Sequence, residues 1–552
     1  MKNIIIILLL LTSIITLKAQ QVDLENLGDV LKKKPLKITG GITANNVFYG
    51  GNEHYNHDFW NYFLSGSINF SFYEQFNLPF SFNITNSGAN MTYPTLPNRF
   101  SFHPTYKWIS GHIGDVSMSF SPYTLNGHQF TGAGVDLTPT GNWKISAMAG
   151  QLQRSVAYDT LNPYSLPYYQ RMGYGTKVRY ETEKYKIGII GFYANDNASS
   201  IAPPPDSLNI VPQKNIVLSG DIWIQLFTNL NLAVEYAHSI LTDKAHELTQ
   251  DFNALKASFN WLFLKNSLGI TYEYVAPDYT TLGAYYFNND FQNITLNYAR
   301  PLFNDKLNVA INLGIQQDDL SNRNNTATNR YVGSVNLSYA PTERINAHAS
   351  YSNFQSHTNI KSPFDYINQT HPAENLDTLN FSQLSQTAGL MVNFSFGKST
   401  KDAIKHQLSL NFNFQEAVNK RGDIAYIGDI TRFYTFATTY GLQFPKGIQL
   451  ISIFNLSYND MGISNQLTLG PSIGINGQFL EKTLSAGILT SYNTGFTDGN
   501  AQNSIANIRG NIGYKPWQHH QFMANCIYQL RSYTGKDNTH GITATIGYAY
   551  NF

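Results

Sequence analysis

The 552-residue chain is poor in charge, because only 13% of its residues are Asp, Glu, Lys or Arg. An average soluble protein has about 25%. The 37 basic and 36 acidic side chains leave a formal net charge of +1, so no basic surface points to nucleic acid. The single cysteine, Cys526, excludes an internal disulfide framework. A mean hydropathy of −0.26 is too polar for a bundle of transmembrane helices, and a hydrophobic content of 42% is too high for disorder.

Long apolar runs are missing as well, except at the N-terminus. Lys2 precedes an almost wholly apolar run at residues 4–17, and Lys18 and Ala19 follow it. This layout is typical of a cleaved secretory signal peptide, and the run is too short to span a bilayer as a helix. We expect residues 1–19 to be removed and the exported chain to carry no helical anchor. Residues 20–35 are expected to form a short periplasmic or lumenal lead-in, either as a short helix or without regular structure.

Aromatic residues and glycines are abundant, and apolar residues alternate with polar ones. The chain has 36 Tyr, 35 Phe and 41 Gly. Segments 307–316 and 407–415 alternate with a period of two, and segments 230–237, 268–274 and 542–552 do the same. A helix would scatter these apolar residues around its circumference, whereas a strand places them on one face. The mature chain is therefore predicted to be all-β.

The connections between the expected strands alternate between short and long. Short connections are expected at residues 74–77, 138–142, 228–229, 264–266, 341–343, 445–447 and 480–482. Long polar loops are expected at residues 50–58, 86–97, 153–167, 197–211, 317–328, 355–379 and 418–428. Outer-membrane barrels have short periplasmic turns and long external loops. We predict that residues 36–552 form a single transmembrane antiparallel β-barrel of about 26 strands, with 24 to 28 allowed, and no N-terminal plug domain.

The last strand carries the most specific motif. A polar residue, a glycine and two spaced aromatic residues end the chain, and they are Thr545, Gly547, Tyr550 and Phe552. This pattern resembles the C-terminal assembly signal of Gram-negative outer-membrane β-barrel proteins. The resemblance implies that the strand docks onto the barrel-assembly machinery by edge pairing. Ala19-Gln20-Gln21 and the richness in Asn and Tyr resemble porin-like members from Bacteroidota; no subfamily is identified.

Two other families of large barrels resemble this chain only in part. TonB-dependent transporters are similar in size class, but they carry an N-terminal plug for which residues 20–35 leave no room. Fimbrial ushers are similar in strand number. The stretch Gly114-Asp115, Leu125-Asn126-Gly127 and Gly132-Ala133-Gly134-Val135 resembles their early barrel, yet their folded plug and periplasmic domains have no room here.

Charged residues with inward parity are predicted to line the pore. They are Lys144, Arg171, Lys177, Arg179, Lys256, Arg330, Arg509, Asp115, Asp221, Glu235 and Glu273. Arg171, Lys177 and Arg179 have the same parity on one strand, and Lys144 lies on the strand before. Two interpretations stay open. The charges either solvate a wide lumen, or they set up a transverse field that orients solutes and favours anions at the cationic cluster.

The leading hypothesis is an outer-membrane porin-like channel for the passive passage of polar solutes. A secretion or assembly barrel that handles a protein partner is the alternative, and a barrel enzyme acting on lipid or surface glycan ranks below it. We expect no enzymatic activity, because His and Ser are scattered without a nucleophile motif. His54 and His57 in one loop, and Asp318 and Asp319 in another, are weak metal candidates. We therefore predict no cofactor or resident metal. The expected partners are outer-membrane lipid, the assembly machinery and polar solutes.

Overall fold

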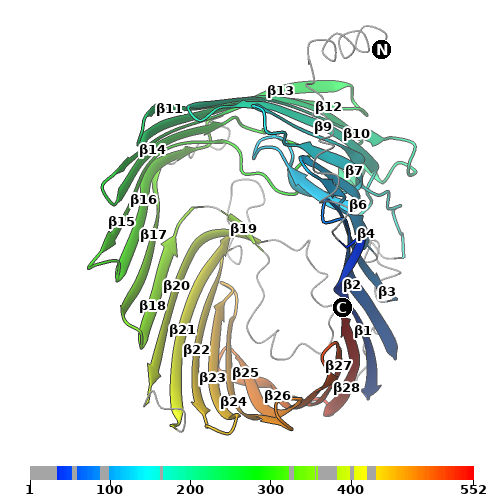
Figure 1. Ribbon diagram of the computed structural model, residues 1–552, viewed down its shortest axis with the longest axis vertical. Helices are drawn as coiled ribbons and strands as arrows, with labels where there is room; N and C mark the ends of the chain where they lie inside the picture. Colours follow the sequence, from blue (N-terminus) through cyan, green and yellow to red (C-terminus); the bar gives the residue numbers. More distant parts are fainter. Residues whose placement is uncertain are drawn as a thin grey trace.

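The computed structural model describes residues 34–52, 59–86, 99–161, 166–321, 329–354, 356–358, 382–397, 403–418 and 430–552. In this part of the chain, 28 strands form one antiparallel sheet that curls into a ring (Figure 1). The predicted signal peptide, the lead-in up to residue 33 and the pair His54 and His57 lie outside the described residues.

The strands of the first half are β1 (Leu36–Gly51), β2 (Trp60–Phe72), β3 (Phe76–Thr85), β4 (Arg99–Phe102), β5 (Thr105–Tyr106), β6 (Ile109–Ser119), β7 (Asn126–Leu137), β8 (Trp143–Gln153), β9 (Gln170–Glu181), β10 (Tyr185–Asn197), β11 (Gln213–Phe227), β12 (Leu230–Asp243), β13 (Leu248–Phe263) and β14 (Asn266–Val275). The strands of the second half are β15 (Phe291–Leu302), β16 (Leu307–Asp318), β17 (Asn329–Thr342), β18 (Ile345–Ser352), β19 (Ser356–Thr358), β20 (Ser382–Phe396), β21 (Lys405–Val418), β22 (Ile430–Gln443), β23 (Ile448–Asp460), β24 (Asn465–Phe479), β25 (Leu484–Thr497), β26 (Asn500–Trp517), β27 (His520–Tyr533) and β28 (Thr539–Asn551).

The sheet closes where its last strand meets its first. β28 pairs with β27 on one side and with β1 on the other. The backbone N–H of Phe552 donates to the carbonyl of Gly40 at 2.9 Å, and the N–H of Gly40 donates to the carbonyl of Phe552 at 2.9 Å. Closure removes the free edges that a sheet cannot expose inside a membrane.

The wall of the barrel has 26 strand positions, which confirms the predicted number. β4 and β5 share one position because both pair with β3 and β6, and β18 and β19 share another because both pair with β20. These two interrupted positions were not foreseen. Neither adds a position to the wall, so the total is unchanged, although β19 lies within residues 355–379, which were predicted to be a loop.

Alternation along the strands produces two different faces. On β16, Leu313 and Ile315 point outward and are each 55% exposed. The residues that alternate with them point inward and are more polar, and one of them, Gln316, is 5% exposed. β10 shows the same exposed outer parity at Ile187 and Ile189. Without lipid around it, an apolar outer band of this kind is left bare, as a transmembrane barrel requires.

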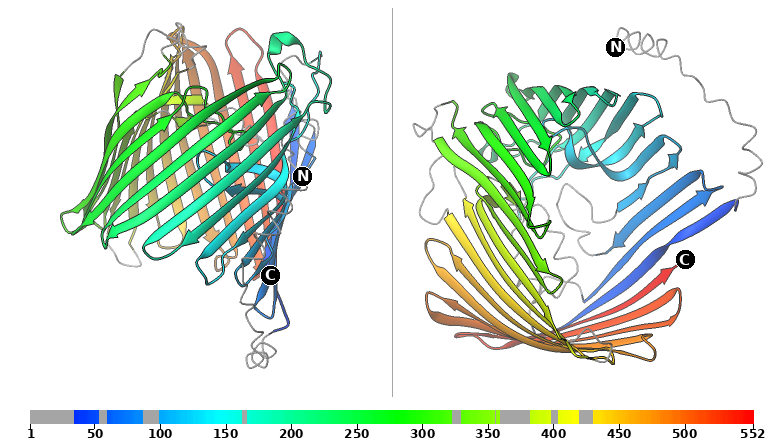
Figure 2. Two further views of the ribbon diagram at one scale, coloured as in Figure 1. Left: turned by 90° about the horizontal axis from the view of Figure 1, so that it is seen from above. Right: turned by 60° about the vertical axis from the view of Figure 1, so that its left-hand side comes forward.

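Short turns gather at the end of the barrel where the chain terminates (Figure 2). Several adopt left-handed backbone angles, as at Leu264 and at Leu480, Glu481 and Lys482, which suits two- to four-residue reversals. The predicted alternation of short and long connections holds from β8 to β12 but not at every described connection, because the turns at residues 244–247, 461–464 and 498–499 are as short as the turns at the opposite end. One long connection was missed. Residues 276–290 join β14 to β15. They are rich in aromatic residues, so their composition does not resemble that of the polar loops.

Helical structure is limited, in the described residues, to the 3₁₀ turn η1 (Asp206–Leu208). No helix in that part of the chain is long and apolar enough to cross a membrane.

Candidate functional site in the barrel lumen

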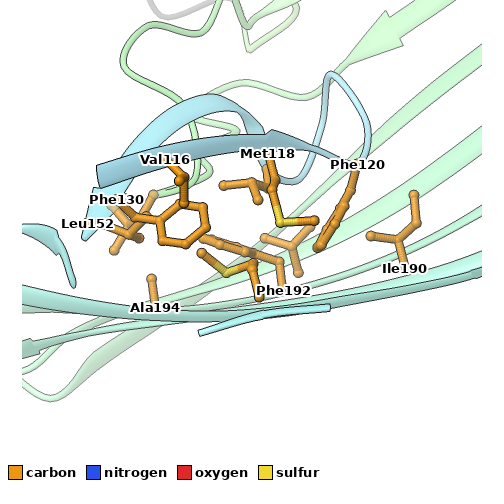
Figure 3. Packing of buried hydrophobic residues seen from close by; sticks show 12 residues of the cluster. Val116, Met118, Phe120, Phe130, Leu152, Ile190, Phe192 and Ala194 are labelled. Carbon is orange, nitrogen blue, oxygen red and sulfur yellow. The ribbon is translucent and has the colours of Figure 1, made fainter. Parts of the chain in front are cut away.

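The hairpin of β6 and β7 leaves the wall halfway along its length. β6 makes its last pairing with β4 at Gly114, and β7 makes its first pairing with β8 at Thr131. Between these points the two strands pair only with each other. Residues 115–130, which we call the lumenal hairpin, lie over the inner side of the wall (Figures 1 and 3).

Two glycines form the hinge of this hairpin. Gly114 has a φ of +97° and pairs with Gly132. A Cβ on Gly114 would lie 2.1 Å from the carbonyl oxygen of Phe100, and a Cβ on Gly132 would lie 2.2 Å from that of Ala149. No other residue type fits such an approach, so these positions require glycine.

Asp115 fills the gap in hydrogen bonding that the departing strand leaves. Its Oδ2 accepts the backbone N–H of Phe100 at 3.0 Å, and its Oδ1 accepts the hydroxyl of Thr131 at 2.5 Å. Asp115 was predicted as a pore-lining charge. The structure places it at the hinge, where it satisfies a strand donor that has lost its partner.

The underside of the lumenal hairpin is apolar and packs on an apolar part of the wall. Figure 3 shows the hairpin side chains lying on those of the wall strands. The cluster consists of Val116, Met118, Phe120, Leu125, Phe130, Met148, Leu152, Ile190, Phe192, Ala194, Val217 and Leu282. Each large side chain that is fully buried contributes about 1.5–3 kcal/mol, so the hairpin is held firmly against the wall.

Glycines on the wall provide the floor for this packing. A Cβ on Gly134 would lie 2.3 Å from the sulfur of Met118, and one on Gly175 would lie 2.6 Å from the ring of Phe120. A Cβ on Gly150 would similarly lie 2.6 Å from the ring of Phe130. The hairpin can therefore lie directly on the backbone of β7 to β9.

Residues 276–290, which we call the locking loop, cover the tip of the hairpin. The hydroxyl of Tyr279 donates to the carbonyl of Tyr123 at 2.8 Å, and that of Thr281 donates to the carbonyl of Thr124 at 2.6 Å. The N–H of Asn126 donates to the carbonyl of Gly283 at 2.9 Å. These three bonds join two segments that are far apart in the sequence.

The two tyrosines of this junction stay protonated. Tyr123 and Tyr279 are 2% and 0% exposed. Burial, reinforced by the negative charge of Glu273, raises the pKa of Tyr123 well above its usual value of about 10. Burial likewise raises the pKa of Tyr279. Both hydroxyls therefore remain donors at physiological pH, and that of Tyr123 donates to Oε1 of Glu273 at 2.6 Å.

Each of the three cations on β9 has a partner. Arg171 donates twice to Asp196, at 2.7 and 3.0 Å. Arg179 donates to Asp221 at 2.6 Å. The Nζ of Lys177 donates to the carbonyl of Phe120 at 2.5 Å and so anchors the hairpin tip. The three do share one face, but they do not form a free positive patch, which removes the physical basis for the predicted preference for anions.

The remaining predicted lining residues are spread around the barrel. Lys144 donates to the carbonyls of Pro139 and Gly141, at 2.5 and 3.3 Å, in the turn before β8. Lys256 lies 3.6 Å from Glu273, and Glu235 accepts the hydroxyl of Ser219 at 3.1 Å. Arg509 is half-buried on β26, and the side chain of Arg330 lies outside the described residues.

The residues of the terminal motif lie at the closing seam. Gly547 pairs with Asn45 of β1, and a Cβ there would lie 2.3 Å from the Oδ1 of Asn45. The ring of Tyr550 stacks on that of Phe552 at 5.4 Å. Thr545 pairs with Val47 in the same register. Their role in assembly stays a prediction.

One polar cluster in the wall was not anticipated. The Nε2 of His112 lies 2.8 Å from Asp136, and its Nδ1 lies 3.0 Å from the Nδ1 of His103. Ser146 also donates to Asp136. The serine contacts the carboxylate and not an imidazole, so this is not the arrangement of an activated nucleophile. Within the described ranges, no group of three or more His, Cys, Asp or Glu side chains could hold a metal ion.

No protein-family model matches the sequence, and no curated protein matches it. Among solved structures, the chain is similar to the copper transporter OprC, with 10% identity, a TM-score of 0.37, and 94% of this chain and 81% of that chain covered. It is also similar to the translocation pore of the P pilus usher PapC, with 10% identity, a TM-score of 0.35, and 93% and 99% covered. It is similar as well to a mutant of the ferric enterobactin receptor PfeA from Pseudomonas aeruginosa, with 12% identity, a TM-score of 0.39, and 93% of this chain and 81% of that chain covered. At these values, nothing about a ligand or partner transfers to this chain.

The class of protein follows from the geometry itself. In the described residues, each strand position of the closed antiparallel wall is hydrogen-bonded to a neighbour on both sides, and the outer face presents apolar side chains. These are the requirements for a β-structure that spans a membrane. The chain is a large closed β-barrel with the geometry of a membrane-spanning wall.

Proposed function

We propose that the chain is an outer-membrane channel for the passive passage of polar solutes, narrowed by the lumenal hairpin and the locking loop. The observation that carries this proposal is the inner face of the wall outside the apolar cluster. On β15 and β16 this face presents Asn293, Asn297, Asn312 and Gln316, which are neutral hydrogen-bonding groups suited to a hydrated passage.

The hairpin supports a selective channel over an unobstructed pore. It is fixed by an apolar underside, by Lys177 at its tip and by the hydroxyls of Tyr279 and Thr281. An element held by so many independent contacts is a permanent part of the lumen. The path for solutes then lies beside it, along the polar strands.

Several further features belong to the same proposal. A signal peptide cleaved after Ala19, delivery to the assembly machinery by the strand that ends at Phe552, and a porin-like lineage in Bacteroidota fit a channel of the outer membrane. No catalytic step is proposed.

The test is conductance of the purified full-length protein in planar lipid bilayers. We expect discrete, stable openings from the wild type. Thr281→Val removes a hydroxyl that bonds the hairpin and leaves the buried carbonyl of Thr124 unpaired, so we expect noisier or larger openings. Thr280→Val is the matched control, because that hydroxyl bonds Asp278 within the locking loop.

The channel proposal would be overturned if neither the wild type nor Thr281→Val conducts current. Heat-shifted mobility on a gel must first verify that both proteins are folded. Stable co-purification of a protein partner by a silent barrel would then favour the secretion or assembly alternative.

A further inference from the structure

A cavity of about 470 Å³ lies beside the lumenal hairpin, between its tip, the locking loop and the inner face of β13 to β16. Its volume falls in the usual range of small-molecule sites. The residues that decide its chemistry come from all of these elements, and they are Tyr123, Phe287, Lys256, Glu273, Asn293 and Asn312.

The cavity carries no net charge. Lys256 and Glu273 are the charged residues of its described lining, and they lie 3.6 Å apart. Glu273 is further occupied by the hydroxyl of Tyr123, which donates to it at 2.6 Å. A charged ligand would find no uncompensated partner here, so the cavity suits a neutral one.

Amide side chains form two rungs on the floor of the cavity. Asn293 on β15 pairs in register with Gln316 on β16, and Asn297 pairs with Asn312. The two rungs are about 13 Å apart at the rise of an antiparallel strand. Between them, Thr295 pairs with Gly314, and the methyl group of Thr295 lies over this glycine, since a Cβ there would be 2.7 Å from the Cγ2 of Thr295.

One of these amides has an acceptor to spare. The Oδ1 of Asn312 is buried and has no hydrogen-bond partner. A buried acceptor without a partner is costly, and a ligand hydroxyl would satisfy it. Amides both donate and accept, as hydroxyl groups do, so the rungs match a ligand that is rich in hydroxyls.

Aromatic rings complete the lining. The rings of Tyr123, at the hairpin tip, and Phe287, in the locking loop, lie 6.1 Å apart, while Phe291 begins β15 and Phe354 adds a further apolar face. A ligand for this cavity needs flat apolar C–H faces as well as hydroxyl edges. Saccharides combine these two properties without charge.

We propose that this cavity binds neutral saccharide units as they pass through the lumen. The proposal rests on the proposed channel function for its role in passage, while the binding itself does not depend on conduction. Such a site must bind weakly enough to release its solute, so we expect half-saturation at a saccharide concentration of about 1 mM.

The binding experiment uses the full-length protein in a detergent without a sugar headgroup, with labelled maltohexaose in equilibrium dialysis. We expect saturable binding by the wild type. The double variant Asn293→Ala with Asn312→Ala should bind about tenfold more weakly, because two hydrogen bonds are lost. Asn308→Ala is the matched control, since Asn308 has the same parity on β16 but lies outside the cavity lining.

Phe287→Ala provides a second variant that leaves the wall untouched, because Phe287 lies in the locking loop. We expect it to weaken binding as well. No saturable binding of maltohexaose by folded wild-type protein would overturn the proposal. Equal binding by the wild type, the double variant and Phe287→Ala would also overturn it, as would tighter binding of citrate than of maltohexaose.

Conductance separates this proposal from the channel itself. Maltohexaose should interrupt the current of the wild type reversibly, and less so in the double variant. If the barrel conducts but neither binds maltohexaose nor is interrupted by it, the channel proposal is supported and the saccharide site is contradicted. If the barrel does not conduct but binds maltohexaose through Asn293 and Asn312, the saccharide site is supported and the channel proposal is contradicted.

Discussion

β10 and β16 have the same kind of outer face and opposite inner faces. Both expose large aliphatic side chains outward, at Ile189 on β10 and at Ile315 on β16. Inward, β10 presents Ile190 and Phe192, which are buried beneath the lumenal hairpin, whereas β16 presents Asn312 and Gln316. The inner face of a barrel strand therefore matches what lies over it: β10 packs against the apolar underside of the hairpin, whereas β16 lines a cavity and is polar.

The two regions also differ in how they treat charge. Near the hairpin, Arg171 and Asp196 form a pair whose side chains are 16% and 2% exposed. On the other side of the barrel, Arg432 and Glu416 are 41% and 13% exposed. The pair near the hairpin is buried as in a protein interior, whereas the Arg432 side chain of the other pair is open to water.

The largest contrast should come from breaking these two ion pairs. Arg171→Gln leaves Asp196 buried without its partner, and we expect a loss of about 3–5 kcal/mol in the free energy of unfolding. Arg432→Gln should cost about 1 kcal/mol or less, because water reaches that pair. Reversible urea unfolding in lipid vesicles measures both. Similar losses for the two variants would mean that the hairpin does not exclude water.

Arginine substitutions test the two faces directly. Ile311→Arg and Leu410→Arg place a charge toward lipid near mid-strand and should each cost about 2–4 kcal/mol. Ile190→Arg should cost as much although it faces the lumen, because its site under the hairpin is dry. Asn411→Arg, on an uncovered inner face, should cost much less. The same unfolding assay applies. A small loss in the free energy of unfolding for Ile190→Arg would contradict the packing of the hairpin on the wall.

A glycine of the floor provides a test of smaller size. Gly175→Val adds a Cβ 2.6 Å from the ring of Phe120, so the hairpin must shift, at about 1–3 kcal/mol. Gly510→Val is the control, since a Cβ on Gly510 meets nothing within 4 Å. Limited proteolysis should cleave the hairpin faster in the first variant alone. Unchanged protection would show that the hairpin does not rest on this glycine.

The smallest effect is expected at a solvated turn outside both regions. His246 lies 2.7 Å from Asp243, and this hydrogen bond raises the pKa of the imidazole above its ordinary 6.5. The charged imidazole is favoured in the folded state, so its small stabilisation is complete below pH 6.5 and is lost as the pH rises through the raised pKa. NMR titration should show the raised pKa, and Asp243→Asn should return it to the ordinary value. A titration unaffected by Asp243→Asn would rule the contact out.

The wall could be predicted from the sequence because a period of two fixes which residues share a face. The strand number, the closure and the polarity of β16 follow from that period and from the spacing of turns. The lumenal hairpin could not be foreseen in this way, since alternation says nothing of what covers a face. A signal did exist, because Ile189 and Ile190 are adjacent and make β10 apolar on both sides.

The partners of the charges were also out of reach. Arg171 and Asp196 are paired across β9 and β10, which requires the register of those strands. Arg179 reaches Asp221 two strands away, past Gly188, where a Cβ would lie 2.2 Å from the carboxylate. Parity along one strand predicts that the cations share a face, but it does not predict which residues of the neighbouring strands lie next to them.

The seam between Gly40 and Phe552 sets the order of events in folding. Its two hydrogen bonds join residues at opposite ends of the barrel sequence. Closing so long a loop is not prohibitive in free energy, since each doubling of loop length costs about 0.6 kcal/mol. It is slow, because contacts of high sequence separation form late. Until that contact forms, β1 and β28 remain open edges, so the last step of assembly is also the step at which an unfinished barrel is most exposed to wrong pairing.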